Sequence, residues 1–270
     1  MRPAPRVHSG QARKRFGQHF LEPAWVAKLV NTLDARPGDT FLEIGPGRGA
    51  LTVPLAAKVK QLLAVELDRD LAAALPAKVP DVRLVQADFL DVSLTDLLHD
   101  SLKPVRVVGN LPYNVASPIL FKLLHDADEG RLLSDATLML QKEVADRLVA
   151  KPGGDGYGAL AIQVALLADA DRILSLPPGA FRPPPKVRSA VVRLRFRSPA
   201  VDVGDRATFE KVVRGLFLQR RKTLANALKP VADSVGRSVS DLIERAQVDA
   251  SKRPEALTLD DFARLTRAVL

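Results

Sequence analysis

The sequence predicts an α/β fold with a mostly parallel sheet, followed by a smaller region made only of helices. Three observations support this prediction. Short apolar segments alternate with helical patterns from residue 23 to residue 150. A glycine-rich loop at residues 45–50 joins one apolar segment directly to a helical pattern. Beyond residue 199, helical patterns follow one another without a strand between them. Alternating strands and helices are typical of a parallel sheet covered by helices on both faces.

The composition limits the classes of function. The chain has 270 residues, of which 47% are hydrophobic, enough for one large domain and one small domain. Because cysteine is absent, disulfides, thiolate metal sites and a cysteine nucleophile are excluded. The four histidines are not spaced as metal ligands, so we expect no metal. The net charge of +9 favours a polyanionic partner. We see no signal peptide and no run that could span a bilayer, and therefore expect a cytoplasmic protein.

The first half of the chain alternates strands and helices. A helix is expected at residues 23–33, because Val26, Leu29, Val30 and Leu33 fall on one of its faces. Short apolar runs predict strands at residues 40–44, 61–66, 82–89 and 105–110. Helices are expected at residues 51–59 and 118–125.

The second half of the chain contains the predicted boundary. We expect, in order, a strand at 136–140, a helix at 142–150, a flexible loop at 151–156, a helix at 157–167, and strands at 171–176 and 187–196. Three consecutive prolines make the segment 181–186 stiff and extended. Helices follow at 207–218, 221–228, 239–246 and 259–269. The composition changes at Ser198 and Pro199, so we divide the chain into a flexible basic arm (1–15), a large domain (16–198) and a helical domain (199–270).

Four candidate ligand-binding residues stand at or just after the ends of predicted strands: Gly45, Glu66, Asp88 and Asn110. Ligands of parallel sheets bind outside the carboxyl ends of the strands, so we expect these four residues to surround one pocket. Glycines let the backbone approach a ligand, and the following helix offers free N–H groups. Glu66 follows the loop at the distance expected of a ribose-binding acid.

This pattern alone leaves alternatives open. NAD and S-adenosylmethionine both present an adenosine to such a loop and acid, so the loop does not separate them. The loop is also compatible with a structural turn that binds no ligand. Asp88 equally fits the first residue of a helix, next to Phe89 in the core.

The segment Asn110-Leu111-Pro112-Tyr113 carries the clearest chemistry. The side-chain oxygen of Asn110 can accept one hydrogen of an exocyclic amine, and a backbone carbonyl near Pro112 can accept the other. Tyr113 offers a face on which a base can stack. We therefore predict that an adenine N6 in RNA attacks the methyl group of S-adenosylmethionine. The alternative is an ordinary turn at the end of a strand, since Asn and Pro both favour turns.

Basic residues gather in three places. Residues 1–15 contain cations but no acid, including Arg13, Lys14 and Arg15. In the strand 187–196 and just after it, Arg193, Arg195 and Arg197 alternate with apolar residues, and no acid occurs from 172 to 201. The third group is Arg220-Arg221-Lys222. Together they predict a surface for a polyanion, whereas each alone fits a solvated tail or helix face.

These segments together resemble the small-subunit ribosomal RNA adenine dimethyltransferases, the KsgA family. The resemblance lies in residues 15–21, 43–52, 65–68, 110–114, 181–187 and 217–228. Its most specific part is the pair Asn110-Leu111-Pro112-Tyr113 and Phe181-Arg182-Pro183-Pro184-Pro185-Lys186. One departure is His19, where the family often has Asn.

The resemblance implies a Rossmann-like class I S-adenosylmethionine methyltransferase sheet with a small C-terminal all-helical RNA-binding domain. It implies S-adenosylmethionine as the cofactor and 16S rRNA, in the 30S subunit or its precursor, as the partner. Two adjacent adenosines of the 3′-terminal hairpin would each be methylated twice at N6. By the same resemblance, the cofactor-binding residues are His19, Leu21, Gly45, Gly47, Glu66, Asp88 and Asn110. The catalytic residues are Asn110, Leu111, Pro112, Tyr113 and Phe181, with Tyr113 and Phe181 on either side of the adenine.

The RNA-binding residues expected from the charge and the resemblance are Arg13, Lys14, Arg15, Lys186, Arg220, Arg221 and Lys222. The resemblance also suggests a monomer. Three other functions remain as alternatives: an NAD-dependent dehydrogenase, a non-catalytic RNA-binding assembly factor, and the related large-subunit rRNA adenine methyltransferase.

Overall fold

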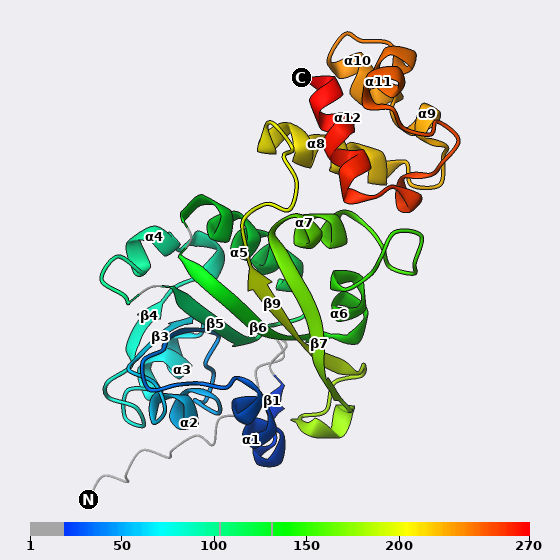
Figure 1. Cartoon of the computed structure of the whole chain (residues 1–270). Helices are drawn as coiled ribbons and strands as arrows, with labels where there is room; N and C mark the ends of the chain where they lie inside the picture. The colour runs from blue at the N-terminus through cyan, green and yellow to red at the C-terminus, as the bar shows by residue number, and fades with distance from the viewer. Residues whose placement is uncertain (1–18, 103, 131) are drawn as a thin grey trace, which may run out of the picture.

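Seven strands form a twisted sheet at the centre of the protein (Figure 1). The computed structural model describes residues 19–102, 104–130 and 132–270. The strand order is β4-β3-β2-β5-β6-β9-β7. All neighbours from β4 to β6 are parallel, while β9 is antiparallel to both β6 and β7. The strands are β2 (Thr40–Ile44), β3 (Gln61–Glu66), β4 (Arg83–Gln86), β5 (Val105–Asn110), β6 (Leu133–Gln141), β7 (Ala168–Leu176) and β9 (Ser189–Phe196).

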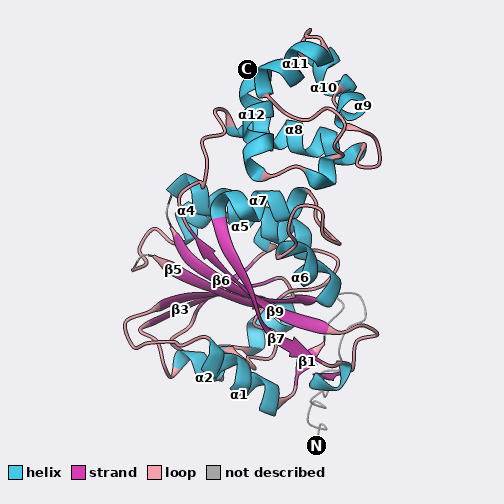
Figure 2. Ribbon diagram, turned by 45° about the vertical axis from the view of Figure 1, so that its right-hand side comes forward, coloured by secondary structure: helices cyan, strands magenta, loops and turns pink. Residues whose placement is uncertain are grey.

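Helices cover both faces of this sheet (Figure 2). Helices α4, α5 and α7 lie on one face, and α1 and α2 lie on the other. In chain order the helices of this part of the protein are α1 (Pro23–Thr32), α2 (Thr52–Ala56), α3 (Arg69–Ala74), α4 (Leu94–Leu97), α5 (Ala116–Gly130), α6 (Lys142–Leu148) and α7 (Ala159–Leu167). The expected α/β fold is confirmed. None of the helices in the described residues is both long and apolar enough to cross a membrane.

The end of the chain is helical and packs beyond α5 and α7 (Figure 1). Its helices are α8 (Arg206–Leu218), α9 (Leu224–Ala227), α10 (Lys229–Ser234), α11 (Val239–Ala246) and α12 (Leu259–Val269). One apolar core runs from the sheet through α5 and α7 into α8 and α12. A second core lies under α1 and α2 on the other face of the sheet. The helical region is therefore joined to the sheet by shared apolar packing.

One predicted strand is shorter than expected. The sequence predicts a strand at 82–89, but β4 ends at Gln86. The cause is Asp88, whose side chain accepts a hydrogen bond from the amide of Leu90 at 2.9 Å and caps the short 3₁₀ helix η2 (Phe89–Asp91). Such a side chain competes with the ladder for backbone groups and ends the strand.

The arginines of β9, with Arg197 just after it, do not form the free basic surface that the sequence suggests. Arg195 pairs with Asp171, and Arg197 pairs with Asp169 at 3.1 Å. Arg193 donates to the carbonyl of Thr32 and to the hydroxyl of Thr137. The two acids belong to β7, which pairs with β9 in an antiparallel register. These guanidinium groups therefore hold the sheet and its neighbours together.

The loop at 151–156, expected to be flexible, is docked on the helical region. The amide of Gly153 donates to the carbonyl of Glu255 at 2.7 Å. Within the loop, the amide of Gly154 donates to the carbonyl of Lys151 at 2.9 Å. Glu255 lies in the 3₁₀ helix η4 (Pro254–Ala256), between α11 and α12. The loop therefore bridges two parts of the chain that are about one hundred residues apart.

Arg106 anchors the strand that carries Asn110. Its guanidinium pairs with Asp135 of β6 at 2.8 Å and with Asp39 at 2.9 Å. It also donates to the carbonyl of Leu33 at 2.7 Å, after α1. All three charged side chains are largely buried. This network ties β5 to β6 and to the connection between α1 and β2.

Replacing Arg106 with leucine will lower the free energy of unfolding by roughly 3–5 kcal/mol, because two buried carboxylates lose their partner. Urea unfolding followed by circular dichroism measures the change. The control is Arg36→Ala, which removes an exposed partner of Asp34; it should change stability by less than about 1 kcal/mol. Equal effects of the two variants would contradict the anchoring role.

Candidate functional site

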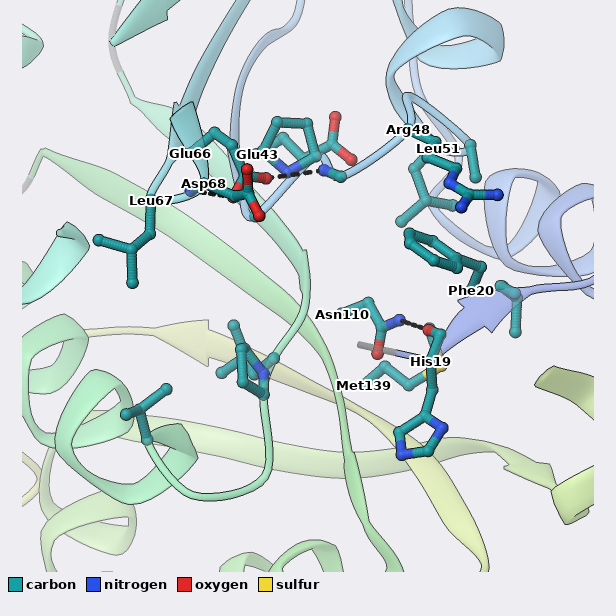
Figure 3. Close-up of a pocket in the computed structure, with 18 of the residues that line it drawn as sticks. His19, Phe20, Glu43, Arg48, Leu51, Glu66, Leu67, Asp68, Asn110 and Met139 are labelled. Carbon is teal, nitrogen blue, oxygen red and sulfur yellow. Dashed lines mark hydrogen bonds between the residues drawn. The ribbon is translucent and has the colours of Figure 1, made fainter. Parts of the chain in front are cut away.

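A pocket opens at the carboxyl ends of β2, β3 and β5 (Figure 3). Its walls come from five stretches of the chain: residues 19–21, the end of β2 with the glycine loop, the end of β3, residues 110–115 at the end of β5, and Met139 of β6. The parallel pairing of β2 with β3 and with β5 brings these strand ends to one edge of the sheet. The pocket therefore lies where a parallel sheet places its ligands.

The glycine loop adopts a backbone that only glycine takes easily. Gly45 and Gly47 have φ angles of 67° and 59°. The amide of Gly47 donates to one carboxylate oxygen of Glu66 at 2.9 Å, and the amide of Asp68 donates to the other at 2.9 Å. Each oxygen keeps a further lone pair. The carboxylate of Glu66 is thus held in one orientation and can still accept hydroxyl hydrogens from a ligand.

Three buried acids line the same pocket: Glu43, Glu66 and Asp68. Glu43 is only 2% exposed. Burial raises the pKa of Glu43 to about 7; the nearby Thr52 hydroxyl opposes this, and the charge of Glu66 adds to it. Among the described residues, Glu43 Oε2 is a buried oxygen without a hydrogen-bond partner. A cationic ligand would complement this acidic floor.

Asn110 ends β5 with a fixed amide. Its Nδ2 donates to the backbone carbonyl of His19 at 2.9 Å (Figure 3). Because the nitrogen is held in this way, the amide oxygen is the atom left for a ligand. The imidazole Nδ1 of His19 donates to the carbonyl of Pro183 at 2.7 Å. His19 thus connects Asn110 to the proline segment, through its carbonyl and its imidazole.

The ring of Tyr113 is also fixed. Its hydroxyl lies 2.7 Å from the hydroxyl of Ser189. The ring of His19 stacks beside it, with centroids 5.9 Å apart and planes 26° apart. Burial raises the pKa of Tyr113, while the bond to Ser189 opposes the shift, so the phenol stays neutral at physiological pH.

Phe20 covers the glycine loop. Its ring lies 3.6 Å from the place where a Cβ of Gly47 would be, and the guanidinium of Arg48 stacks on it at 4.2 Å. The short strand β1 (Phe20–Leu21) pairs with β8 (Phe181–Arg182), which follows the 3₁₀ helix η3 (Pro178–Ala180). The segment 19–21 is therefore held over the pocket from both sides.

The structure brings most of the predicted site residues into this pocket. They are His19, Leu21, Gly45, Gly47, Glu66, Asn110, Leu111, Pro112 and Tyr113. Asp88 and Phe181 do not line it. Asp88 caps η2, and Phe181 is 1% exposed in the core under α1. In this structure His19, rather than Phe181, lies beside Tyr113.

Several pocket residues were missed in the sequence. The most relevant are Glu43, Arg48, Asp68 and Met139. An acid in the middle of an apolar strand was the available signal for Glu43. The sequence held a signal for Asp68 as well, because aspartate is a preferred residue directly before a helix. In the structure it precedes α3, and its side chain accepts hydrogen bonds from the amides of Asp70 and Leu71.

The predicted RNA-binding residues that the structure describes lie outside this pocket. Arg13, Lys14 and Arg15 fall outside the described residues. Lys186, Arg220, Arg221 and Lys222 are exposed. Arg220 lines a second, open cleft together with Lys142 and Arg188, between the sheet-bearing part and the helical region. In the described residues, no group of three acidic or histidine side chains could hold a metal ion.

This sheet order, glycine loop and strand-end pocket define the Rossmann-like fold of the class I methyltransferases. Two solved structures share the fold. A dimethyladenosine transferase from Plasmodium falciparum superposes with a TM-score of 0.78 at 24% identity, covering 92% of this chain and 96% of its own. The 23S rRNA methyltransferase ErmE superposes with a TM-score of 0.64 at 26% identity, covering 93% of this chain and 99% of its own.

Sequence comparison identifies the family within this class. The family model described as ribosomal RNA adenine dimethylase matches residues 9–268. Ribosomal RNA small subunit methyltransferase A of Acinetobacter baylyi is 43% identical over 97% of this chain and 94% of its own length. The protein of the same name from Xanthomonas oryzae pv. oryzae is 45% identical, over 95% and 96%. The chain belongs to the ribosomal RNA adenine dimethylase family, which confirms the resemblance and the methyltransferase activity predicted from the sequence.

The burial of Glu43 makes stability depend on pH. Between pH 4.5 and about 7 the unfolded chain has released the Glu43 proton and the folded chain has kept it. Stability therefore falls as pH rises through this window and levels off above it. Relative to Glu43→Gln, the free energy of unfolding of the unchanged protein should decrease by roughly 2–3 kcal/mol from pH 4.5 to 8.

Urea unfolding at pH 5, 6, 7 and 8 measures this difference. Glu143→Gln is the control, because Glu143 is exposed; its difference from the unchanged protein should be nearly constant over the same range. A constant difference for Glu43→Gln as well would show that Glu43 titrates normally in the folded protein.

Proposed function

We propose that this protein transfers methyl groups from S-adenosylmethionine to N6 of two adjacent adenosines in the 3′-terminal hairpin of 16S rRNA, two to each. The substrate is the 30S subunit or its precursor, in the cytoplasm, and the protein acts as a monomer. The observation that carries the proposal is the fixed amide of Asn110 at the wall of an acidic strand-end pocket.

The pocket suits S-adenosylmethionine, in which a sulfonium joins an adenosine to an amino-acid part that carries an ammonium group. When bound, this cofactor supplies an electrophilic methyl group. The buried carboxylates of Glu66 and Asp68 complement its positive charges, and Glu43 adds to them when its proton is lost. Glu66 is oriented to accept the ribose hydroxyls, while Gly45, Gly47, His19 and Leu21 line the walls. Asp88 does not line the pocket, so its contact with the adenine amino group, through the carboxylate lone pairs that its cap of η2 leaves over, requires the adenine to extend beyond the pocket lining.

The acceptor side holds the amine in place. Asn110 Oδ1 accepts one N6 hydrogen, and the carbonyl of Leu111 accepts the other. The neighbouring carbonyl of Pro112 already accepts the amide of Val115 at 3.1 Å, which closes the turn. With both hydrogens held, the N6 lone pair points along the transfer direction. Such positioning is worth roughly 7–11 kcal/mol of the barrier in well-oriented systems. No covalent enzyme intermediate is needed.

Tyr113 provides the stacking face for the flipped adenine, with Phe181 on the opposite side of the base. Tyr113 is held by Ser189 and needs no rearrangement. Because Phe181 is 1% exposed, RNA binding has to uncover its ring before the base can stack on it. The exposed residues Lys186, Arg220, Arg221 and Lys222, with the N-terminal basic residues Arg13, Lys14 and Arg15, bind the RNA phosphates.

Two comparisons bear on which rRNA is the substrate. The relatives named small subunit methyltransferase A are 43–45% identical, whereas ErmE, named for 23S rRNA, is 26% identical. The small subunit is therefore the first candidate and the large subunit the second. Primer extension across both rRNAs, isolated with and without this protein, separates the two.

Replacing Asn110 with alanine should abolish methyl transfer, because N6 loses the acceptor that orients it, while cofactor affinity changes only by a modest factor. The assay is incorporation from tritiated S-adenosylmethionine into unmethylated 30S subunits, with cofactor affinity measured by calorimetry. Asn31→Ala, which changes an exposed asparagine on α1, is the matched control. Full activity of the Asn110 variant would reject the assigned role.

Neutralising Arg220, Arg221 and Lys222 together should weaken RNA binding and flatten its salt dependence, because fewer phosphates are neutralised on binding. The slope of log affinity against log salt concentration is the measurement. Replacing Arg193, Arg195 and Arg197, whose charges are held by groups within the protein, should leave that slope unchanged in variants that fold. An unchanged slope after neutralising residues 220–222 would remove this turn from the RNA footprint.

A further inference from the structure

One tyrosine connects the sheet-bearing part of the protein to the helical region. Tyr157, at the end of the docked loop, is 6% exposed, and its hydroxyl donates to the carbonyl of Leu257 at 2.9 Å. Burial, with the charge of Asp261, raises the pKa of Tyr157, so the hydroxyl keeps its proton. A second hydrogen bond, from the amide of Gly153 to the carbonyl of Glu255, involves residues close in sequence to Tyr157 and Leu257. Both bonds cross from one part of the protein to the other.

The ring of Tyr157 packs on the helix that precedes the basic turn, through Phe217. It packs edge-on against Phe217, with centroids 6.3 Å apart and planes 72° apart. Phe217 in turn stacks on Phe262 of α12 at 5.9 Å. Phe217 is in the last turn of α8, three residues before Arg220. Tyr157 therefore contacts the last turn of α8, the helix that leads into the turn Arg220–Lys222.

The far side of the turn is fixed to the helical region. The amide of Leu224 donates to the carbonyl of Lys252 at 2.7 Å, and the amide of Ala225 donates to that of Ala250 at 3.2 Å. The turn therefore moves with the helical region. Its position relative to the methylation pocket depends on how that region is docked on the sheet-bearing part.

The open cleft lies where the position of the basic turn affects RNA binding. Tyr157, Phe217 and Arg220 all line it. Ser117 of α5 and Arg188 line it as well, and α5 starts just after the segment that carries Asn110 and Tyr113. An RNA that reaches the pocket and the basic turn at once has to fit across this cleft.

We infer that Tyr157 is a positioning residue, which sets the distance between the basic turn Arg220–Lys222 and the methylation pocket through its hydrogen bond to Leu257 and its contact with Phe217. The inference rests on the proposed function, since it concerns how the same site receives its RNA. It predicts that Tyr157 contributes to the binding of the 30S subunit and makes no contribution to the methyl-transfer step. Tyr157 is not among the residues that line the methylation pocket.

The test is Tyr157→Phe, which keeps the ring and removes only the hydroxyl. With unmethylated 30S subunits, KM should rise about fivefold, the loss expected of one buried hydrogen bond, while kcat and cofactor affinity stay unchanged. Ser234→Ala is the control: it removes a hydroxyl bonded to the carbonyl of Val231 within the helical region, in α10, outside the contact of Tyr157 with Leu257 and Phe217. An unchanged KM for Tyr157→Phe, or an equal rise in the control, would overturn the inference.

A double-mutant cycle tests whether Tyr157 acts through the basic turn. In a background with Arg220, Arg221 and Lys222 changed to alanine, Tyr157→Phe should no longer raise KM, because the contact it positions is gone. Additive effects of the two changes would show that Tyr157 acts elsewhere and would refute the proposed role.

A physical measurement separates this inference from the proposed function. The chain has no cysteine, so spin labels can be attached at Lys58→Cys and Ser240→Cys, two exposed positions in the two parts. Tyr157→Phe should broaden the distribution of distances between the labels, and an unchanged distribution would overturn the inference. Lack of methyl transfer to 30S subunits by the unchanged protein would reject the proposed function instead, and the label distances would still decide the positioning role.

Discussion

The hydrogen bond from Asn110 to the carbonyl of His19 is the interaction on which the site depends. It joins the end of a central strand to a segment that precedes the first helix, and it decides which atom of the amide faces a ligand. The strand itself is held close to its neighbour. A Cβ at Gly109 would lie 2.9 Å from the carbonyl of Ile44, so a larger residue would push β5 away from β2. The position of Asn110 thus follows from backbone packing as much as from its own contacts.

The protein separates its charges by location. Its net charge is +9, yet the pocket floor contains three buried acids. Water screens exposed cations, whereas buried carboxylates act at short range in a medium of lower dielectric constant. A small cation is therefore attracted by the pocket, and a polyanion by the outer surface. The two ligands of a nucleic-acid methyltransferase carry these opposite charges.

Local patterns were sufficient to predict the bounds of β2, β3 and β5 and the residues at their ends, because strand runs and strand-end loops depend on neighbouring residues. What the sequence could not show depends on register and on distant contacts. Arg195 and Arg197 looked free until β7 placed Asp171 and Asp169 beside them. The loop at 151–156 looked flexible because its partner, Glu255, is about one hundred residues away. The stacking role predicted for Phe181 came from the family resemblance, and the place of its ring in the core under α1 depends on distant contacts.

The burial of Phe181 has a structural cause that bears on how RNA would enter. Phe181 pairs with Leu21 across the short strands β1 and β8, and His19 binds the carbonyl of Pro183 one residue beyond β8. The same His19 accepts the bond from Asn110. The segment over the pocket, the proline segment and the amide of Asn110 are therefore linked. A movement that exposes Phe181 to a base would strain the contact that orients Asn110, so the two sides of the acceptor site must rearrange together.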